Sequence, residues 1–293
     1  MDEENRKTIE ELVTRYTLEP ELRDLYVEGT TAKSIFDWYF EKLNCGTIAI
    51  FEIDSVNIPS DLVNNYGLEP GNREELIVLS LEIERLLEKD IEYLLCVADS
   101  DFDLLFGHKY KSRYLLYSEY TSTDLCFCSE EAIANLFRLG IRRIPCPIKT
   151  LLVNFAEVLQ EVFLIRAANE RLGWKMRWID FVSCCDIKND LVVFNRYKFI
   201  ESYLNNANKN KKSEKFIRVC EELRSINVKS FKHRIRGHDF HELLGWYISK
   251  RAGKKGNKYR DPDIVRTAIV TAANAELVID TEPFRTLLKT YKS

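Results

Sequence analysis

The stretch that decides the fold is EYLLCVADSDFD, at residues 92–103. Its apolar residues run from 93 to 98 without alternation, which is typical of a parallel strand covered on both faces. The run ends in three carboxylates, Asp99, Asp101 and Asp103. Because side chains two apart emerge on the same side of an extended chain, we expect Asp99 and Asp101 to point at one place.

Two ionised carboxylates that share a site repel each other unless a cation or a proton lies between them. The pair therefore predicts a site for Mg²⁺, with Mn²⁺ as the other suitable ion. The alternative is an acidic turn that caps the next element.

A second strand ends in an acid near the N-terminus. Residues 22–29 read LRDLYVEG, so a short apolar run leads into Glu28 and Gly29. A helical pattern follows at 31–43. In open α/β sheets, ligands collect at the carboxyl ends of the strands, where the loops are free of packing duties. We therefore expect Glu28 to lie near the aspartates.

The order of the predicted elements indicates an α/β fold with a parallel sheet. Further strands are expected at 47–53 and 114–117, and helices at 73–88 and 129–139. Gly140, Pro145 and Pro147 then break the pattern, and the rest of the chain is expected to be mostly helical. The predicted helices of this region lie at 151–172, 196–206, 213–225, 239–252, 261–275 and 282–291. The sequence thus predicts an α/β domain at 1–145 with the acidic site, and a mostly helical domain at 146–293.

Composition describes an ordinary globular protein, with 45% hydrophobic and 30% charged residues. The sequence has no run of 18 apolar residues, and its acidic start, MDEE, is unlike a signal peptide. We therefore expect a cytoplasmic protein without a membrane partner. The eight cysteines show no C-x-x-C spacing, which disfavours structural zinc. P-loop, G-x-S-x-G and G-x-G-x-x-G motifs are missing from the sequence, so ATP hydrolysis, a serine triad and dinucleotide binding lack support.

Positive charge is concentrated in residues 207–260, which hold 16 Lys or Arg and 5 Asp or Glu. Residues 1–206 hold 23 basic and 36 acidic residues. A polyanion that approaches the acidic site needs a positive surface, so the basic segment predicts nucleic-acid binding. The alternatives are a solvated basic face and a surface that docks an acidic protein. The candidate binding residues are Lys229, Lys232, Arg234, Arg236, Lys254, Lys255 and Lys258.

The two histidines at 238 and 241 lie three apart on a predicted helix and could share a face. We favour a structural role for this region, with Asp239 as a helix cap and His238 buried, and not a metal site.

Together, V-E-G at 27–29 and D-x-D at 99–101 resemble the Toprim domain of topoisomerases, bacterial primases and OLD-type nucleases. More narrowly, Thr123-Asp124, Glu130 and R-G-H-D at 236–239 resemble the Toprim family that includes AriB, the nuclease subunit of the PARIS anti-phage system. The resemblance implies a Toprim-like N-terminal domain and an endonuclease in which Glu28, Asp99 and Asp101 are catalytic and bind Mg²⁺ or Mn²⁺. It also implies a toxic effector of abortive infection whose target is RNA, such as tRNA, or DNA. Such an effector would be held in check by an ABC-type ATPase partner and be active as a homodimer.

One departure from the Toprim pattern bears on mechanism. Relatives often carry a second acid three residues after the Gly of E-G, and here Ala32 stands at the matching place. A second metal would need Asp103, Asp124 or Glu130 as a ligand; otherwise the site holds one ion or is impaired. If the site is impaired, the chain is a catalytically degenerate Toprim subunit that binds nucleic acid or a protein.

A third class of function is an enzyme of another type that uses D-x-D to hold a metal-bound nucleotide sugar or a phosphate. A glycosyltransferase would leave Glu28 without a role. A phosphatase of the D-x-D-x-T type needs its nucleophile at the end of the first strand, where this chain has Glu28.

Overall fold

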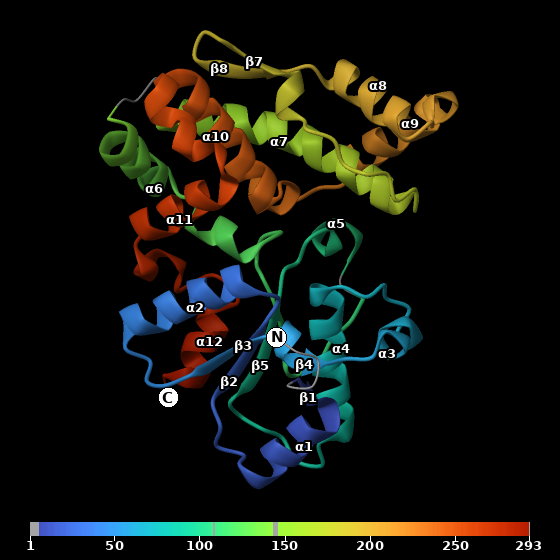
Figure 1. Ribbon diagram of the computed structural model, residues 1–293, viewed down its shortest axis with the longest axis vertical. Helices are drawn as coiled ribbons and strands as arrows, with labels where there is room; N and C mark the ends of the chain where they lie inside the picture. The colour runs from blue at the N-terminus through green and yellow to red at the C-terminus, as the bar shows by residue number, and fades with distance from the viewer. Residues whose placement is uncertain (1–5, 108, 143–145, 293) are drawn as a thin grey trace. The chain divides into compact units, whose positions relative to one another are not determined.

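The computed structural model describes residues 6–107, 109–142 and 146–292, which fold into two compact units (Figure 1). Unit 1 consists of Met1–Ser100, His108–Cys126 and Ala275–Ser293. Unit 2 consists of Asp101–Gly107 and Phe127–Asn274. The predicted α/β fold with a parallel sheet in the N-terminal part and a mostly helical C-terminal region is confirmed.

The units divide the chain differently from the boundary expected at 145/146. Residues 101–107 belong to unit 2, although they directly follow a strand of unit 1. Ala275–Ser293 belongs to unit 1, although the whole helical region precedes it. Pro145 lies outside the described residues.

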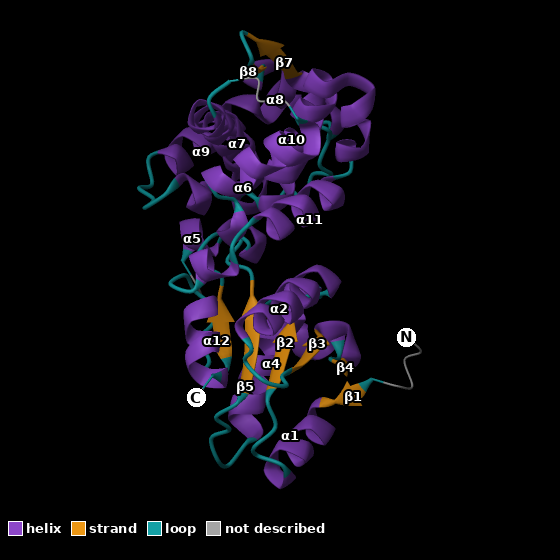
Figure 2. Ribbon diagram, turned by 90° about the vertical axis from the view of Figure 1, so that its left-hand side faces the viewer, coloured by secondary structure: helices purple, strands orange, loops and turns teal. Residues whose placement is uncertain are grey.

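A four-stranded parallel sheet forms the centre of unit 1 (Figure 2). Its strand order is β3 (Ala49–Glu52), β2 (Asp24–Val27), β5 (Leu94–Ala98) and β6 (Leu115–Tyr117). Every residue of β2 and β5 is buried, which explains the unbroken apolar run of β5 and the apolar residues that follow Asp24 in β2. Val27 pairs with Val97, so the carboxyl ends of these two strands lie side by side.

Helices α1 (Ile9–Leu18) and α4 (Asn72–Leu86) contribute to one core of unit 1. It combines Tyr16, Leu76 and Leu79 with the strand residues Tyr26 and Cys96. The Tyr16 hydroxyl lies 2.8 Å from Oδ2 of Asp24 and 2.9 Å from the hydroxyl of Tyr26. The smaller elements of this unit are α3 (Ser60–Asn65) and a two-stranded parallel sheet of β1 (Lys7–Thr8) and β4 (Val56–Asn57).

The C-terminal helix α12 (Phe284–Tyr291) packs on α2 (Thr30–Leu43) through aromatic rings. The ring centroid of Phe284 lies 5.4 Å from that of Phe36 and 4.7 Å from that of Tyr39. The Tyr291 hydroxyl donates a hydrogen bond to the backbone oxygen of Asp24, at 2.9 Å. Helix α12 is therefore an integral part of the sheet unit.

Unit 2 is built around α7 (Ile148–Arg171), most of whose apolar residues are buried. The helices predicted for the C-terminal region are present, with bounds that differ from the expected ones by at most three residues. The other helices of the unit are α5 (Asp103–Phe106), α6 (Glu130–Asn135), α8 (Arg196–Asn206), α9 (Ser213–Arg224), α10 (Gly237–Ala252) and α11 (Pro262–Ala272). Among the described residues, none of the helices combines the length and the apolar character needed to cross a membrane.

An antiparallel hairpin of β7 (Cys185–Lys188) and β8 (Leu191–Phe194) was not predicted. Its two-residue turn is Asn189-Asp190, with φ angles of 49° and 67°. Asn and Asp tolerate positive φ at such turns, so this dipeptide is the signal that could have revealed the hairpin.

Candidate functional site

Glu28 and Asp99 directly follow the adjacent strands β2 and β5 and lie against each other, as the sequence predicted. Oε1 of Glu28 accepts a hydrogen bond from the backbone N–H of Asp99, at 2.7 Å. Nδ2 of Asn72, at the start of α4, donates to the backbone oxygen of Glu28 at 2.8 Å. The parallel register of the two strands thus brings residues 71 positions apart into direct contact.

Asp99 is the centre of this acidic edge, which we define as Glu28, Asp99 and Asp124. Its Oδ1 accepts hydrogen bonds from the backbone N–H and the Oγ1 of Thr123, at 2.8 and 2.9 Å. Burial raises the pKa of Asp99 well above its usual value, and the charges of Glu28 and Asp124 raise it further. The two hydrogen bonds from Thr123 act in the opposite direction. Like charges thus crowd around Asp99, a situation that a cation or a proton relieves.

Asp124, one of the expected supplementary ligands, lies within range of Asp99 in the same unit. Its side chain is largely buried, and its Oδ1 accepts a hydrogen bond from Oγ of Ser122 at 2.6 Å. A short helical segment, Thr123–Phe127, positions both Thr123 and Asp124. Asp124 is therefore a better third acid for Glu28 and Asp99 than Asp101.

Asp101 has a different setting from the one that its spacing suggested. Strand β5 ends at Ala98, and Asp101 has a φ of 43°, so the alternation of an extended chain does not reach it. Its Oδ1 pairs with Nε of Arg236 at 3.2 Å, within unit 2. The Arg236 guanidinium also lies 5.8 Å from the ring centroid of Phe102.

The remaining two candidate ligands also belong to unit 2. Asp103 is the first residue of α5, where a negative charge suits the helix N-terminus. Glu130 is exposed in the first turn of α6, and Oγ of Ser129 caps that helix by accepting from the backbone N–H of Ala132. The position of each acid at the start of its own helix therefore accounts for its negative charge without a metal ion.

The donor chemistry of the acidic edge suits Mg²⁺, because hard cations prefer carboxylate oxygens. In residues 6–107, 109–142 and 146–292, however, no group of three or more Asp, Glu, His or Cys side chains is arranged to hold a metal ion. Oxygens of Glu28 and Asp99 instead accept the backbone and Thr123 hydrogen bonds described above. A bound cation would therefore require these side chains to turn toward it.

Arg73 is a functional candidate that the sequence reasoning missed. Its Nε donates to the backbone oxygen of Asp99 at 2.8 Å, and its guanidinium lies 6.0 Å from the ring centroid of Tyr117. The side chain is 15% exposed, so it brings a largely buried positive charge to the acidic edge. The only sequence signal was its place at the beginning of the helix that precedes β5.

The seven basic candidates of unit 2 differ in accessibility. Lys229, Lys254 and Lys258 are exposed, and Lys232 is half-buried. The side chain of Lys255 lies outside the described part of the chain. Arg236 is engaged by Asp101, as described above.

Arg234 is buried, and its guanidinium donates to the backbone oxygens of Arg224 and Ile226. This placement closes the end of α9 and does not favour the predicted contact with nucleic acid.

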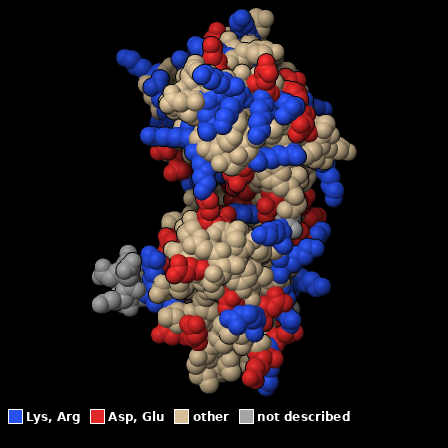
Figure 3. All heavy atoms as spheres, turned by 90° about the vertical axis from the view of Figure 1, so that its right-hand side faces the viewer, with Lys and Arg blue, Asp and Glu red and all other residues tan. Residues whose placement is uncertain are grey.

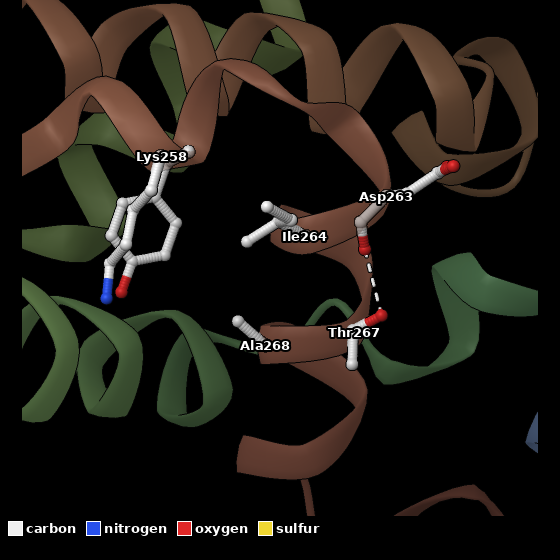
Figure 4. A pocket seen from close by; sticks show the side chains of 6 residues that line it. Lys258, Asp263, Ile264, Thr267 and Ala268 are labelled. Atoms are coloured by element: carbon white, nitrogen blue, oxygen red, sulfur yellow. Dashed lines mark hydrogen bonds between the residues drawn. The ribbon is translucent and has the colours of Figure 1, made fainter.

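Lys258 lies at an open cavity of about 430 Å³ beside α11 (Figure 4). Ile264 and Ala268 give this cavity an apolar floor, and Nζ of Lys258 lies 4.9 Å from the ring centroid of Tyr259. The hydroxyl of Thr267 is bonded to the backbone of its own helix, through the oxygen of Asp263 at 2.9 Å. Lys258 shares the lining of this cavity with the acidic residue Asp263, so positive charge does not dominate there.

The predicted roles of Asp239 as a helix cap and of His238 as a buried residue are wrong. Asp239 caps no helix; its carboxylate accepts two hydrogen bonds from Arg166, at 2.7 and 2.9 Å, and is almost fully buried. His238 is exposed, and His241 is the buried one, with Nε2 3.9 Å from Sγ of Cys128. The i, i+3 spacing therefore does not place the two imidazoles on a common face.

Comparison with protein-family models gave no match, and neither did comparison with curated proteins. The resemblance to Toprim proteins accordingly rests on the residues of this chain alone.

Proposed function

We propose that this chain is a Mg²⁺-dependent Toprim nuclease that hydrolyses phosphodiester bonds in nucleic acid. The observation that carries the proposal is the contact of Glu28 with Asp99 at the ends of two adjacent parallel strands, with Asp124 close enough to act on the same carboxyl. Acids at this edge of a parallel sheet are in the usual place for ligand binding in α/β folds.

In this proposal, Glu28 and Asp99 bind the cation and Asp124 supplies the third acid. When bound, Mg²⁺ or Mn²⁺ supplies Lewis acidity and lowers the pKa of a water molecule. The protein orients the acids: Thr123 fixes Asp99 through two hydrogen bonds, and Arg73 adds a positive charge beside them. Asp101 is left out of the ligand set, because Arg236 already engages its carboxylate.

The biological role follows from the resemblance to the AriB family. We propose a toxic effector of anti-phage defence that cleaves RNA, such as tRNA, or DNA. An ABC-type ATPase partner would restrain it, and the active form would be a homodimer. The separation of charge, with 16 basic residues in 207–260, supports a polyanionic substrate.

A catalytically degenerate subunit that binds nucleic acid or a protein is the second candidate. It is favoured by the hydrogen bonds that already engage Glu28 and Asp99, and by Ala32 at the position of a second acid. In that case the acidic edge is a structural remnant and the basic segment carries the function.

A cleavage assay with Mg²⁺, Mn²⁺ or EDTA separates the two candidates. Glu28→Gln keeps an oxygen that can accept from the Asp99 N–H but removes the charge, so loss of activity would report on the metal site and not on folding. We expect Glu28→Gln and Asp99→Asn to lower cleavage at least about 100-fold, in the range of removing one strong electrostatic interaction in an active site. Glu41→Gln, an exposed carboxylate on α2, is the matched control. Undiminished cleavage by Glu28→Gln and Glu28→Ala would overturn the nuclease assignment.

Sequencing of nucleic acids from cells that express the wild type or Glu28→Ala would identify the substrate. New ends that occur only with the wild type mark the cleaved molecules.

A further inference from the structure

Helices α8 and α9 of unit 2 border an open cavity of about 420 Å³, which we call the α8–α9 cavity. Its apolar wall consists of Tyr197, Ile200, Leu204 and Ile217. Cavities of roughly 300–1,000 Å³ with mostly apolar walls and a few polar groups are typical of small-ligand sites. Neither the acidic edge nor the predicted basic residues make use of this cavity.

Tyr197 is the most conspicuous residue of the cavity, because its side chain is 77% exposed. Single exposed apolar residues are common, but this one borders a cavity instead of standing alone on a helix. A tyrosine at such a rim offers a flat aromatic face to a planar ligand at small cost in conformational entropy.

The polar residues that line the cavity are Glu201, Ser213 and two asparagines. Asn205 lies near the end of α8 and Asn210 begins the following turn, Asn210–Lys212, and the two side chains are hydrogen-bonded to each other. A carboxamide has both donors and an acceptor, which matches the mixed donor and acceptor edges of a nucleobase.

Positive charge surrounds the cavity. Residues 196–218 contain seven Lys or Arg and two Asp or Glu. Lys198, Lys211, Lys212 and Lys215 are all exposed, and Figure 3 shows Lys and Arg side chains crowding the upper part of the face that it draws. One opposing charge, Glu201, borders the cavity itself.

Two lysines of this region are held near a second aromatic residue. Nζ of Lys209 lies 5.2 Å from a ring centroid of Trp174, and Nζ of Lys212 lies 5.8 Å from it. Trp174 is stacked on the ring of Phe216, which anchors α9. Both ammonium groups therefore lie within cation–π range of an aromatic ring that is itself packed in unit 2.

We propose that the α8–α9 cavity binds one unpaired base of a single-stranded nucleic-acid segment, while Lys209, Lys211 and Lys212 contact the adjacent phosphates. Aromatic stacking combined with lysine contacts to the backbone is the general mode of single-strand binding. In a duplex the base faces are stacked inside and cannot reach Tyr197. This inference rests on the proposed function, in which nucleic acid is the substrate. It limits the substrate to nucleic acids with loops, tails or other unpaired strands.

The test is fluorescence anisotropy with the full chain, in EDTA so that nothing is cut. The probes are a labelled RNA of about 12 nucleotides, the DNA of the same sequence, and the fully paired duplex of each, since single-strand sites span roughly 4–16 nucleotides. We expect Tyr197→Ala to weaken single-strand binding about 10-fold and Tyr197→Phe to retain it, because stacking needs the ring and not the hydroxyl. Duplex binding should be unchanged by either substitution.

The lysines are tested by Lys211→Glu with Lys212→Glu, which should lower the slope of log affinity against log salt by about 0.7 for each phosphate that is no longer neutralised. The control is Lys42→Glu with Lys89→Glu, two exposed lysines of unit 1 that give the same change in net charge. Leu18→Ala, at 76% exposure, is the matched control for removal of an exposed apolar side chain.

Wild-type binding by all α8–α9 variants, together with loss of cleavage in Glu28→Gln, would overturn this inference and leave the proposed function standing. Loss of single-strand binding in Tyr197→Ala, together with undiminished cleavage in every acidic-edge variant, would support the inference and remove the nuclease assignment. Equal loss on single strands and duplexes would also overturn it, because the base pocket would then play no part.

Discussion

Glu242 on α10 should make the stability of unit 2 depend on pH. Its side chain lines a cavity of about 380 Å³ together with Asp180, Cys185 and Lys250. Burial, and then the charges of Asp239 and Asp180, raise the pKa of Glu242 from 4.5 to about 7, while Arg166 acts in the opposite direction. The folded state therefore holds a proton on this carboxyl at pH values where the unfolded chain has lost it.

The sign of the effect follows from proton linkage. Between pH 4.5 and about 7 the folded state binds more protons than the unfolded state, so the free energy of unfolding falls as pH rises. The contribution is fully present below pH 4.5 and is lost as pH rises through about 7. At roughly 1.4 kcal/mol per pKa unit, the shift corresponds to at most about 3 kcal/mol. Because the side chain is half-buried, solvent screening reduces the expected effect to about 1–2 kcal/mol.

Glu242→Gln removes the titration and keeps the shape of the side chain. We expect the variant to match the wild type near pH 4 and to be about 1–2 kcal/mol more stable at pH 8, since a neutral amide avoids the cost of a buried charge. Urea unfolding between pH 4 and 8, followed by the fluorescence of Trp174, Trp178 and Trp246 in unit 2, measures the difference. Glu157→Gln, an exposed carboxylate on α7, is the control. A difference that is the same at both ends of the pH range would refute the reasoning.

Three further predictions concern other contacts. Arg166→Met leaves the buried carboxylate of Asp239 without its partner and should lower the free energy of unfolding by about 3–5 kcal/mol. The double variant Arg166→Met with Asp239→Leu should recover much of this loss, and urea titration of both variants measures the difference. Gly245→Ala would place a methyl group against the backbone oxygen of Tyr259, so we expect a fall in melting temperature equivalent to about 2 kcal/mol or more. An unchanged melting temperature would show that the backbone at Tyr259 moves away from the methyl group at little cost. Asp99→Asn keeps an oxygen for the two hydrogen bonds from position 123 but cannot ionise. In a thermal melt with EDTA, at a pH high enough to ionise the wild-type Asp99, the variant should be about 1 kcal/mol more stable, and a lower melting temperature there contradicts like-charge crowding.

The central strands could be predicted from sequence because their burial on both faces leaves a continuous apolar signal. The same signal placed Glu28 and Asp99 at neighbouring strand ends, since parallel strands align their carboxyl ends. Helix α8 has the predicted bounds, 196–206, and the structure shows that the side chain of Asn195 caps its start by accepting from the backbone N–H of Lys198.

The part of the site that was not predictable depends on contacts between distant segments. The direction of Asp101 could not be foreseen, because the two-residue alternation holds only while the backbone stays extended. Nor does any local pattern reveal that Arg73 donates to the backbone of Asp99, 26 positions away. Arg234 was assigned to a surface from its charge alone, and only the fold shows that its guanidinium binds backbone oxygens at the end of α9.

The packing of α12 on α2 sets an order of events during synthesis. A ribosome makes the four sheet strands and α2 first, then residues 127–274 of unit 2, and only afterwards the helix that packs on Phe36, Tyr39 and Phe40. Until that helix emerges, these three aromatic rings lack their contacts with Phe284 and Tyr291, and the backbone oxygen of Asp24 lacks the Tyr291 hydroxyl. The acidic edge therefore belongs to a unit that can finish folding only after the helical unit has been synthesised, which gives a chaperone that binds exposed aromatic residues a defined interval in which to act.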